Sequence, residues 1–176
     1  IEFGYRYISS KVSLIANLYN MQYKNQLILT GEVNDVGSPI RINVPNSFRR
    51  GLELTAAVKL NHKFSLRFNT TLSQNKIAEF TEYIGHWDPP YEAFTESHEN
   101  TDIAFSPSVI GGSQLIFTPF SSLEKGKLDL ALVSKYVGEQ YLDNTSSEYG
   151  KLEDYFVHDF RASYTVKTKL FKEVVI

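Results

Sequence analysis

Strict alternation of apolar and polar residues is the feature that most constrains this chain. Over residues 51–60 the even positions are apolar, while the odd positions include Glu53, Thr55 and Lys59. The same alternation returns over 64–73, 128–136 and 156–167. Successive side chains of a strand point to opposite faces, whereas a helical period would mix polar with apolar residues here. The sequence therefore predicts one-sided β-strands.

The connections between the predicted strands alternate in length. Further strands are predicted over 2–9, 11–23 and 108–120, with an eighth beginning at 174–176. Short connections fall at 9–11, 61–63, 121–126 and 167–171, and long connections fall at 24–47, 75–107 and 142–154. An antiparallel up-and-down meander with its long loops at one end explains this pattern. Within it, Gly111–Gly112 is interpreted as a β-bulge.

A one-sided strand can face three environments: a second sheet, the inside of a soluble barrel, or lipid. The predicted strands reach the roughly 9–11 residues that cross a bilayer with tilt. Their polar face carries full charges, and aromatic residues gather near strand ends, as in interfacial girdles. The girdle candidates are Tyr19, Tyr23, Phe48, Phe64, Phe117, Tyr136, Tyr141, Tyr155 and Phe156. These observations favour an all-β transmembrane barrel over a soluble β-sandwich.

Composition excludes several function classes. The chain has 176 residues, 18 basic against 20 acidic side chains, and no cysteine. This near-neutral balance gives no electrostatic reason to expect nucleic acid, and thiolate metal sites are impossible. No nucleophile elbow, phosphate-binding loop or dinucleotide fingerprint is present. We therefore expect a protein that is not an enzyme and has no cofactor and no resident metal.

Several segments together resemble a known family. They are 17–26 (NLYNMQYKNQ), 40–54 (IRINVPNSFRRGLEL), 71–77 (TLSQNKI), 132–144 (LVSKYVGEQYLDN) and 154–164 (DYFVHDFRASY). In ensemble they are similar to the C-terminal β-barrel of TonB-dependent outer-membrane receptors, and the resemblance covers almost the whole chain.

The resemblance implies a barrel of about twenty-two strands, closed by an N-terminal plug domain and driven by the energy-coupling protein TonB. Residues 1–176 would then be a partial, C-terminal portion of that barrel, about seven to eight strands, without the plug. The implied function is active uptake of a scarce nutrient across the outer membrane of a Gram-negative bacterium. An iron–siderophore chelate is the first candidate, ahead of haem, cobalamin or a glycan.

The implied partners are outer-membrane lipid, TonB, the small-molecule chelate and a companion lipoprotein. The alternative is an autonomous eight-stranded membrane barrel. The interior of such a barrel would be filled by side chains. Such a barrel would act as an adhesin, a structural protein or a membrane enzyme.

Two groups of residues are candidate sites. Substrate contacts are expected on the loop 75–107, because binding residues are often carried by loops, and the candidates are His86, Trp87, Asp88, Tyr91 and His98. The alternative is an ordinary solvated acidic loop with Trp87 packed under its own turn. His86 and His98 lack the spacing of a His-Glu-x-x-His metal motif.

The second group consists of charges on the polar face, which would point into the lumen. Its members are Glu53, Arg67, Asp159 and Arg161. They are interpreted either as plug contacts or as inter-strand ion pairs.

Overall fold

The computed structural model describes the chain except residues 35, 85–88, 90–93, 123–125 and 167–173. Its strands are β1 (Glu2–Ile8), β2 (Val12–Val33), β3 (Pro39–Lys59), β4 (Phe64–Ile84), β5 (Phe94–Asp102), β6 (Val109–Ser122), β7 (Gly126–Val137), β8 (Gln140–Tyr141), β9 (Lys151–Leu152), β10 (Tyr155–Val166) and β11 (Val174–Val175). A 3₁₀ turn covers Glu148–Gly150. Within the described part of the chain, no helix has the length and apolar character needed to cross a membrane.

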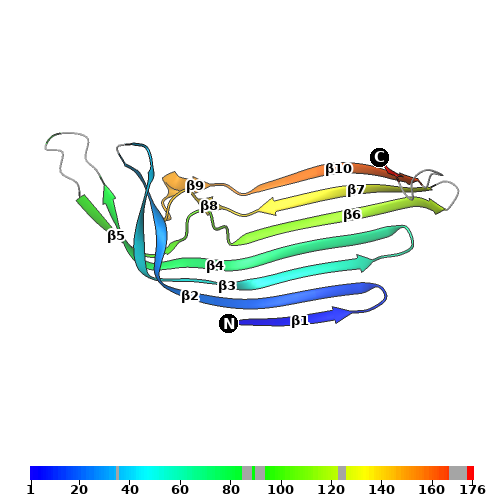
Figure 1. Cartoon of the computed structure of the whole chain (residues 1–176), viewed down its shortest axis with the longest axis horizontal. Helices are drawn as coiled ribbons and strands as arrows, with labels where there is room; N and C mark the ends of the chain where they lie inside the picture. Colours follow the sequence, from blue (N-terminus) through cyan, green and yellow to red (C-terminus); the bar gives the residue numbers. More distant parts are fainter. Residues whose placement is uncertain (35, 85–88, 90–93, 123–125, 167–173) are drawn as a thin grey trace.

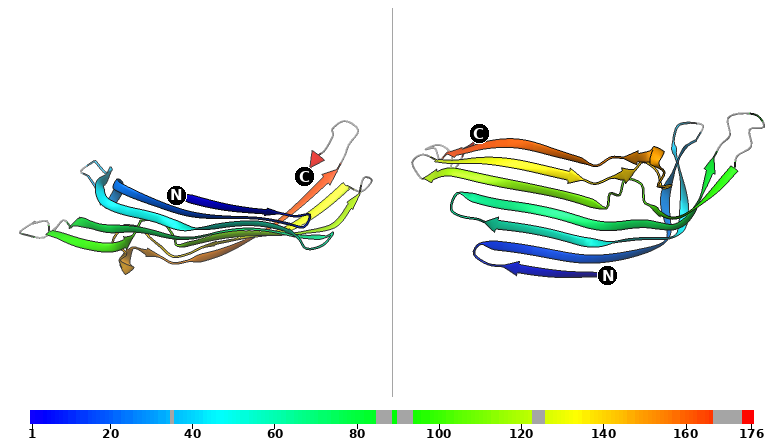
Figure 2. Two further views of the ribbon diagram at one scale, coloured as in Figure 1. Left: turned by 90° about the horizontal axis from the view of Figure 1, so that it is seen from below. Right: turned by 180° about the vertical axis from the view of Figure 1, so that it is seen from behind.

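Nine strands form one antiparallel sheet in the order β1-β2-β3-β4-β6-β7-β10-β11, with β5 also paired to β4. The sheet is a single curved layer (Figures 1 and 2). Chain neighbours are mostly sheet neighbours, so the predicted up-and-down meander is confirmed. Among the described residues β1 pairs only with β2, and β11 only with β10. This open arrangement fits neither a closed eight-stranded barrel nor a two-sheet sandwich.

The register gathers the apolar side chains on one face of the sheet. One cross-strand row runs from Val58 through Leu66, Leu115 and Leu132 to Phe160. No other layer covers this row in the described structure, and Phe160 remains 73% exposed. The leucines therefore do not converge on a shared interior. They form the outward face that the sequence assigned to lipid.

Aromatic pairs lie at both ends of the apolar face. Phe64 stacks on Phe117 with ring centroids 4.7 Å apart, next to the short turns. Tyr136 approaches Phe156 at 6.3 Å near the opposite end. These pairs fit interfacial girdles. The candidates Tyr19, Tyr23 and Tyr155 are different, because the register places them on the polar face. The Tyr19 hydroxyl lies 2.8 Å from where a Cβ on Gly51 would stand.

The short connections are tight turns closed by side chains. The Asn61 Oδ1 accepts hydrogen bonds from the backbone N–H groups of Lys63 (2.8 Å) and Phe64 (2.9 Å). The Ser9 Oγ accepts from the Val12 N–H at 3.0 Å. Asn and Ser mimic a backbone turn in this way, so the predicted turns at 9–11 and 61–63 are confirmed.

Two of the predicted long loops are mostly strand. β2, β3 and β4 are 22, 21 and 21 residues long, and β4 continues beyond β6 to pair with β5. Beyond the alternating rows a hairpin has no face that must contact lipid, so apolar residues need not alternate although the backbone ladder continues. The third, 142–154, contains the 3₁₀ turn and β9.

The bulge predicted at Gly111–Gly112 is also wrong. Both glycines pair in unbroken register with β4 and β7. The irregularity lies between Phe117 and Phe120 instead, around Pro119, which has no N–H to donate to the ladder.

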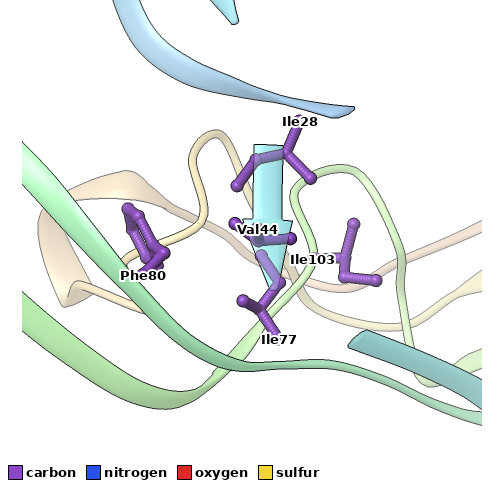
Figure 3. Close-up of a cluster of buried hydrophobic side chains, with 5 residues drawn as sticks. All are labelled: Ile28, Val44, Ile77, Phe80 and Ile103. Atoms are coloured by element: carbon purple, nitrogen blue, oxygen red, sulfur yellow. The ribbon is translucent and has the colours of Figure 1, made fainter. Parts of the chain in front are cut away.

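The outer ends of the β2–β3 and β4–β5 hairpins, beyond the alternating rows, share a small hydrophobic core. Its members converge from β2, β3, β4 and the segment after β5 (Figure 3); they are Ile28, Val44, Ile77, Phe80 and Ile103. Asn144, which is 1% exposed, connects these elements. Its Nδ2 donates to the Leu29 carbonyl, and its Oδ1 accepts from the Ala104 N–H at 2.8 Å.

Replacing Leu54 by Arg should destabilise the assembled barrel by about 2–4 kcal/mol, because the charge would enter lipid near the middle of a strand. Thr55→Arg is the matched control, since Thr55 neighbours Leu54 but faces the polar side and is exposed. Ala131 makes a poorer control because it is only 4% exposed. Folding titrations in lipid vesicles measure both variants, and equal damage from the two would contradict the lipid-facing assignment.

Asn144→Ala should loosen the hairpins without melting the sheet. The variant leaves the half-buried Ala104 N–H and Leu29 carbonyl without their partner, at a cost of about 1 kcal/mol each, the lower end of the range for an unsatisfied polar group. Amide hydrogen exchange should become faster across 26–44 and 101–106 and stay unchanged in β7 and β10. Asn20→Ala, at an exposed position of β2, is the control and should leave both regions as they are.

Candidate functional site

A hollow of about 600 Å³ on the polar face of the sheet is the first candidate site. Gly111 and Gly112 are part of its wall. Gly112 shares the polar face with Asn69 and Lys135, and its lack of a side chain leaves room between β4 and β7. Three cationic side chains surround it, Arg67 from β4, Lys135 from β7 and Arg161 from β10. The predicted lumen residues Arg67 and Arg161 are thus brought together at one hollow. Lys135 was missed as a site residue, although it alternates with the apolar positions of β7.

The charges predicted on the polar face do not pair with one another. Among the ion pairs of the described residues, none includes Glu53, Arg67, Asp159 or Arg161. Among the described residues, Glu53 accepts one long hydrogen bond, 3.4 Å, from Asn17 Nδ2. Arg67 and Asp159 share a cross-strand row, but β6 and β7 lie between their strands, which separates them by roughly three spacings of about 4.8 Å. None of the four side chains therefore forms the predicted inter-strand ion pair within the described structure.

The second candidate site lies on the β4–β5 hairpin. His98, the one predicted loop residue within the described structure, lies opposite Phe80 and stacks on its ring with centroids 5.0 Å apart. Its Nε2 is 2.8 Å from the Glu82 Oε2. The other predicted loop contacts, His86, Trp87, Asp88 and Tyr91, lie outside the described residues.

Glu96 completes this hairpin cluster, which we define as Glu82, Glu96 and His98. One ligand atom from each residue lies within 4.8 Å of the others. Glu82 and Glu96 are directly opposite in the register. The sequence analysis placed His98 on an acidic loop and did not find the cluster, because it treated the segment as a loop. On a strand, their spacing of two residues places both on one face.

The segment between β7 and β10 is attached to this hairpin by polar contacts. The Ser146 Oγ accepts from the Asp102 N–H at 2.8 Å, and the Asp102 carboxylate meets the Lys76 Nζ at 2.8 Å. Lys151, in β9 at the end of this segment, donates a hydrogen bond to Glu139. This bond raises the pKa of Lys151, and attraction to Glu139, Glu148 and Glu153 raises it further. Hydrogen bonds and ion pairs therefore hold this segment against the hairpin.

The arrangement of the chain matches known proteins in two ways. A family model described as TonB dependent receptor-like, beta-barrel, matches residues 1–174. No curated protein matches the chain. Solved structures do match, although their sequence identities are low, so they bear on the fold alone.

Three similar structures are siderophore or iron receptors by description. The ferric yersiniabactin uptake receptor FyuA from Yersinia pestis is 18% identical, with a TM-score of 0.61 over 93% of this chain and 21% of that chain. The ferric preacinetobactin receptor BauA from Acinetobacter baumannii is 11% identical, with a TM-score of 0.63 over 99% of this chain and 27% of that chain. The ferric-catecholate import receptor Fiu from K12 E. coli is 14% identical, with a TM-score of 0.59 over 93% and 20%.

The chain thus spans between 20% and 27% of the length of these three receptors. Its meander of two-faced antiparallel strands is the architecture of their barrels, and the family match extends over nearly every residue. The chain belongs to the TonB-dependent receptor-like β-barrel family.

Proposed function

We propose that this chain is part of the barrel of an outer-membrane receptor that imports an iron–siderophore chelate with energy supplied through TonB. The family match over residues 1–174 is the observation that carries the proposal. The similar structures point the same way, since they include receptors for ferric yersiniabactin, ferric preacinetobactin and ferric catecholates. In this proposal residues 1–176 form a C-terminal portion of the barrel, and the plug and the TonB-binding segment belong to the rest of the receptor.

The two faces of the sheet support the proposal, because each is suited to a different contact. The apolar face has the composition required to contact lipid. The polar face carries Arg67, Lys135 and Arg161 around its hollow, and we assign these cations to contacts with the plug inside the lumen. The hairpins extend the barrel wall outward, where a chelate would first meet the receptor. The candidates His86, Trp87, Asp88 and Tyr91, together with His98, remain the proposed chelate contacts. A companion lipoprotein would also meet the receptor at this outer end.

Uptake of radioactive iron by whole cells tests the function. Deleting the gene for the full receptor should abolish uptake of one ferric siderophore from a panel of catecholate and hydroxamate chelates. The same uptake should be lost in cells that lack TonB. Haem and cobalamin belong in the panel as the competing substrates. Iron uptake that persists without the receptor, or that is independent of TonB, would contradict the proposal.

Charge reversal on the polar face tests the plug contacts. The double variant Arg67→Glu, Arg161→Glu should reduce uptake severalfold, since like charges placed across an interface oppose association. Lys59→Glu is the control, because Lys59 is a polar-face cation of the same sheet outside the hollow. The shift in electrophoretic mobility on heating checks that each variant assembles. Equal uptake by the double variant and the control would remove the assignment.

A further inference from the structure

We propose that the hairpin cluster of Glu82, Glu96 and His98 binds a divalent transition-metal ion of the zinc class. The inference concerns these three side chains alone and does not depend on which chelate, if any, the receptor transports. It starts from the register of β4 and β5, which brings residues far apart in the sequence into one small group.

The cluster has the donor set of a three-ligand metal site. Zinc is bound by imidazole nitrogens and by Asp or Glu oxygens, and a site with three protein ligands keeps its fourth position for water. With metal–ligand distances of about 2.0–2.2 Å, tetrahedral ligand atoms lie roughly 3.4 Å apart. The three ligand atoms already lie within 4.8 Å of one another, so small side-chain rotations would complete the geometry. Magnesium and calcium prefer more oxygen ligands than this cluster offers.

Electrostatics gives the cluster a reason to bind a cation. Glu82 and Glu96 lie directly across the strand pair, and like charges in that position are destabilising. Without a metal, His98 offers a single hydrogen bond to Glu82, and Glu96 has no such contact in the described structure. A divalent ion would compensate both carboxylates at once.

Packing holds the histidine ready for this role. The His98 side chain is 14% exposed, and its ring stacks on Phe80, which is itself 5% exposed within the hairpin core. The imidazole therefore loses little conformational freedom on binding, and such preorganisation raises affinity. Glu96 is exposed, which leaves a path for the ion from solvent.

The same two strands provide an internal control. Glu79 and Glu99 are also directly opposite each other. They are not part of the one group of potential metal ligands among the described residues, which consists of Glu82, Glu96 and His98. If opposed carboxylates alone attracted metal, this pair would bind as well. Glu99→Gln therefore removes one charge from the same strand without touching the proposed ligands.

Zinc binding to the full-length receptor in detergent tests the proposal. After treatment with a chelator, Zn²⁺ is titrated in competition with a chromophoric zinc chelator and with excess Mg²⁺ present. The wild type should bind Zn²⁺, His98→Gln and Glu96→Gln should each weaken binding by about tenfold or more, and Glu99→Gln should bind like the wild type. X-ray absorption at the zinc edge should show one nitrogen among the oxygen ligands and lose it in His98→Gln.

Two results would overturn the proposal. One is a wild-type receptor that shows no Zn²⁺ binding in the micromolar range, and the other is equal weakening by Glu99→Gln and Glu96→Gln, which would indicate general surface charge. Since Glu96 is exposed, its variant should assemble even if His98→Gln does not, and the mobility shift on heating verifies this. Iron uptake is measured separately, so loss of metal binding with normal uptake leaves the transport proposal intact.

Discussion

The constraint on which the rest of this structure depends is that lipid offers no hydrogen bonds. A strand that crosses a bilayer must have its backbone paired by neighbouring strands, and only the side chains that face the hydrocarbon must be apolar. The sheet meets both demands with long antiparallel ladders and rows such as Leu66–Leu115–Leu132. Its other face is then free to carry arginine, lysine and glutamate. The contrast between the faces gives the chain its alternating sequence.

Sequence reasoning succeeded where that contrast exists and failed where it ends. The parity of β3 and β4 predicted which side of the sheet each residue occupies, and the register agrees residue by residue. In the outer parts of β3 and β4, residues 39–47 and 75–84, water replaces lipid and the alternation is lost. The sequence therefore predicts loops where the strands continue. The hollow with its three cations depends on which residues lie side by side across strands, and parity alone cannot supply that register. The hairpin cluster needed the pairing of Glu82 with Glu96, which a stretch treated as a loop cannot reveal.

The two halves of the molecule are stabilised by different forces. Within the bilayer, an apolar side chain gains little by moving from lipid tails to contact with leucine, because the two environments are equally apolar. The strands are therefore held together by backbone hydrogen bonds and by side-chain packing. The hairpins lie beyond the alternating rows, where the hydrophobic effect operates again, and there Val44 and Ile77 are essentially inaccessible. Asn144 belongs to this second regime. It satisfies a carbonyl of one hairpin and an N–H beyond the other, so it fixes how the two meet.

The unbroken course of β4 from Phe64 to Ile84 limits how the outer hairpin can move (Figure 1). One backbone takes part in the ladder with β3, the ladder with β6 and the ladder with β5. Sliding β4 along any neighbouring strand would break many backbone hydrogen bonds at once. A shift of one residue would also move the leucines of β4 from the apolar face to the polar face. The β4–β5 hairpin can therefore bend and twist relative to the rest of the sheet, but it cannot slide along the strands that pair with β4.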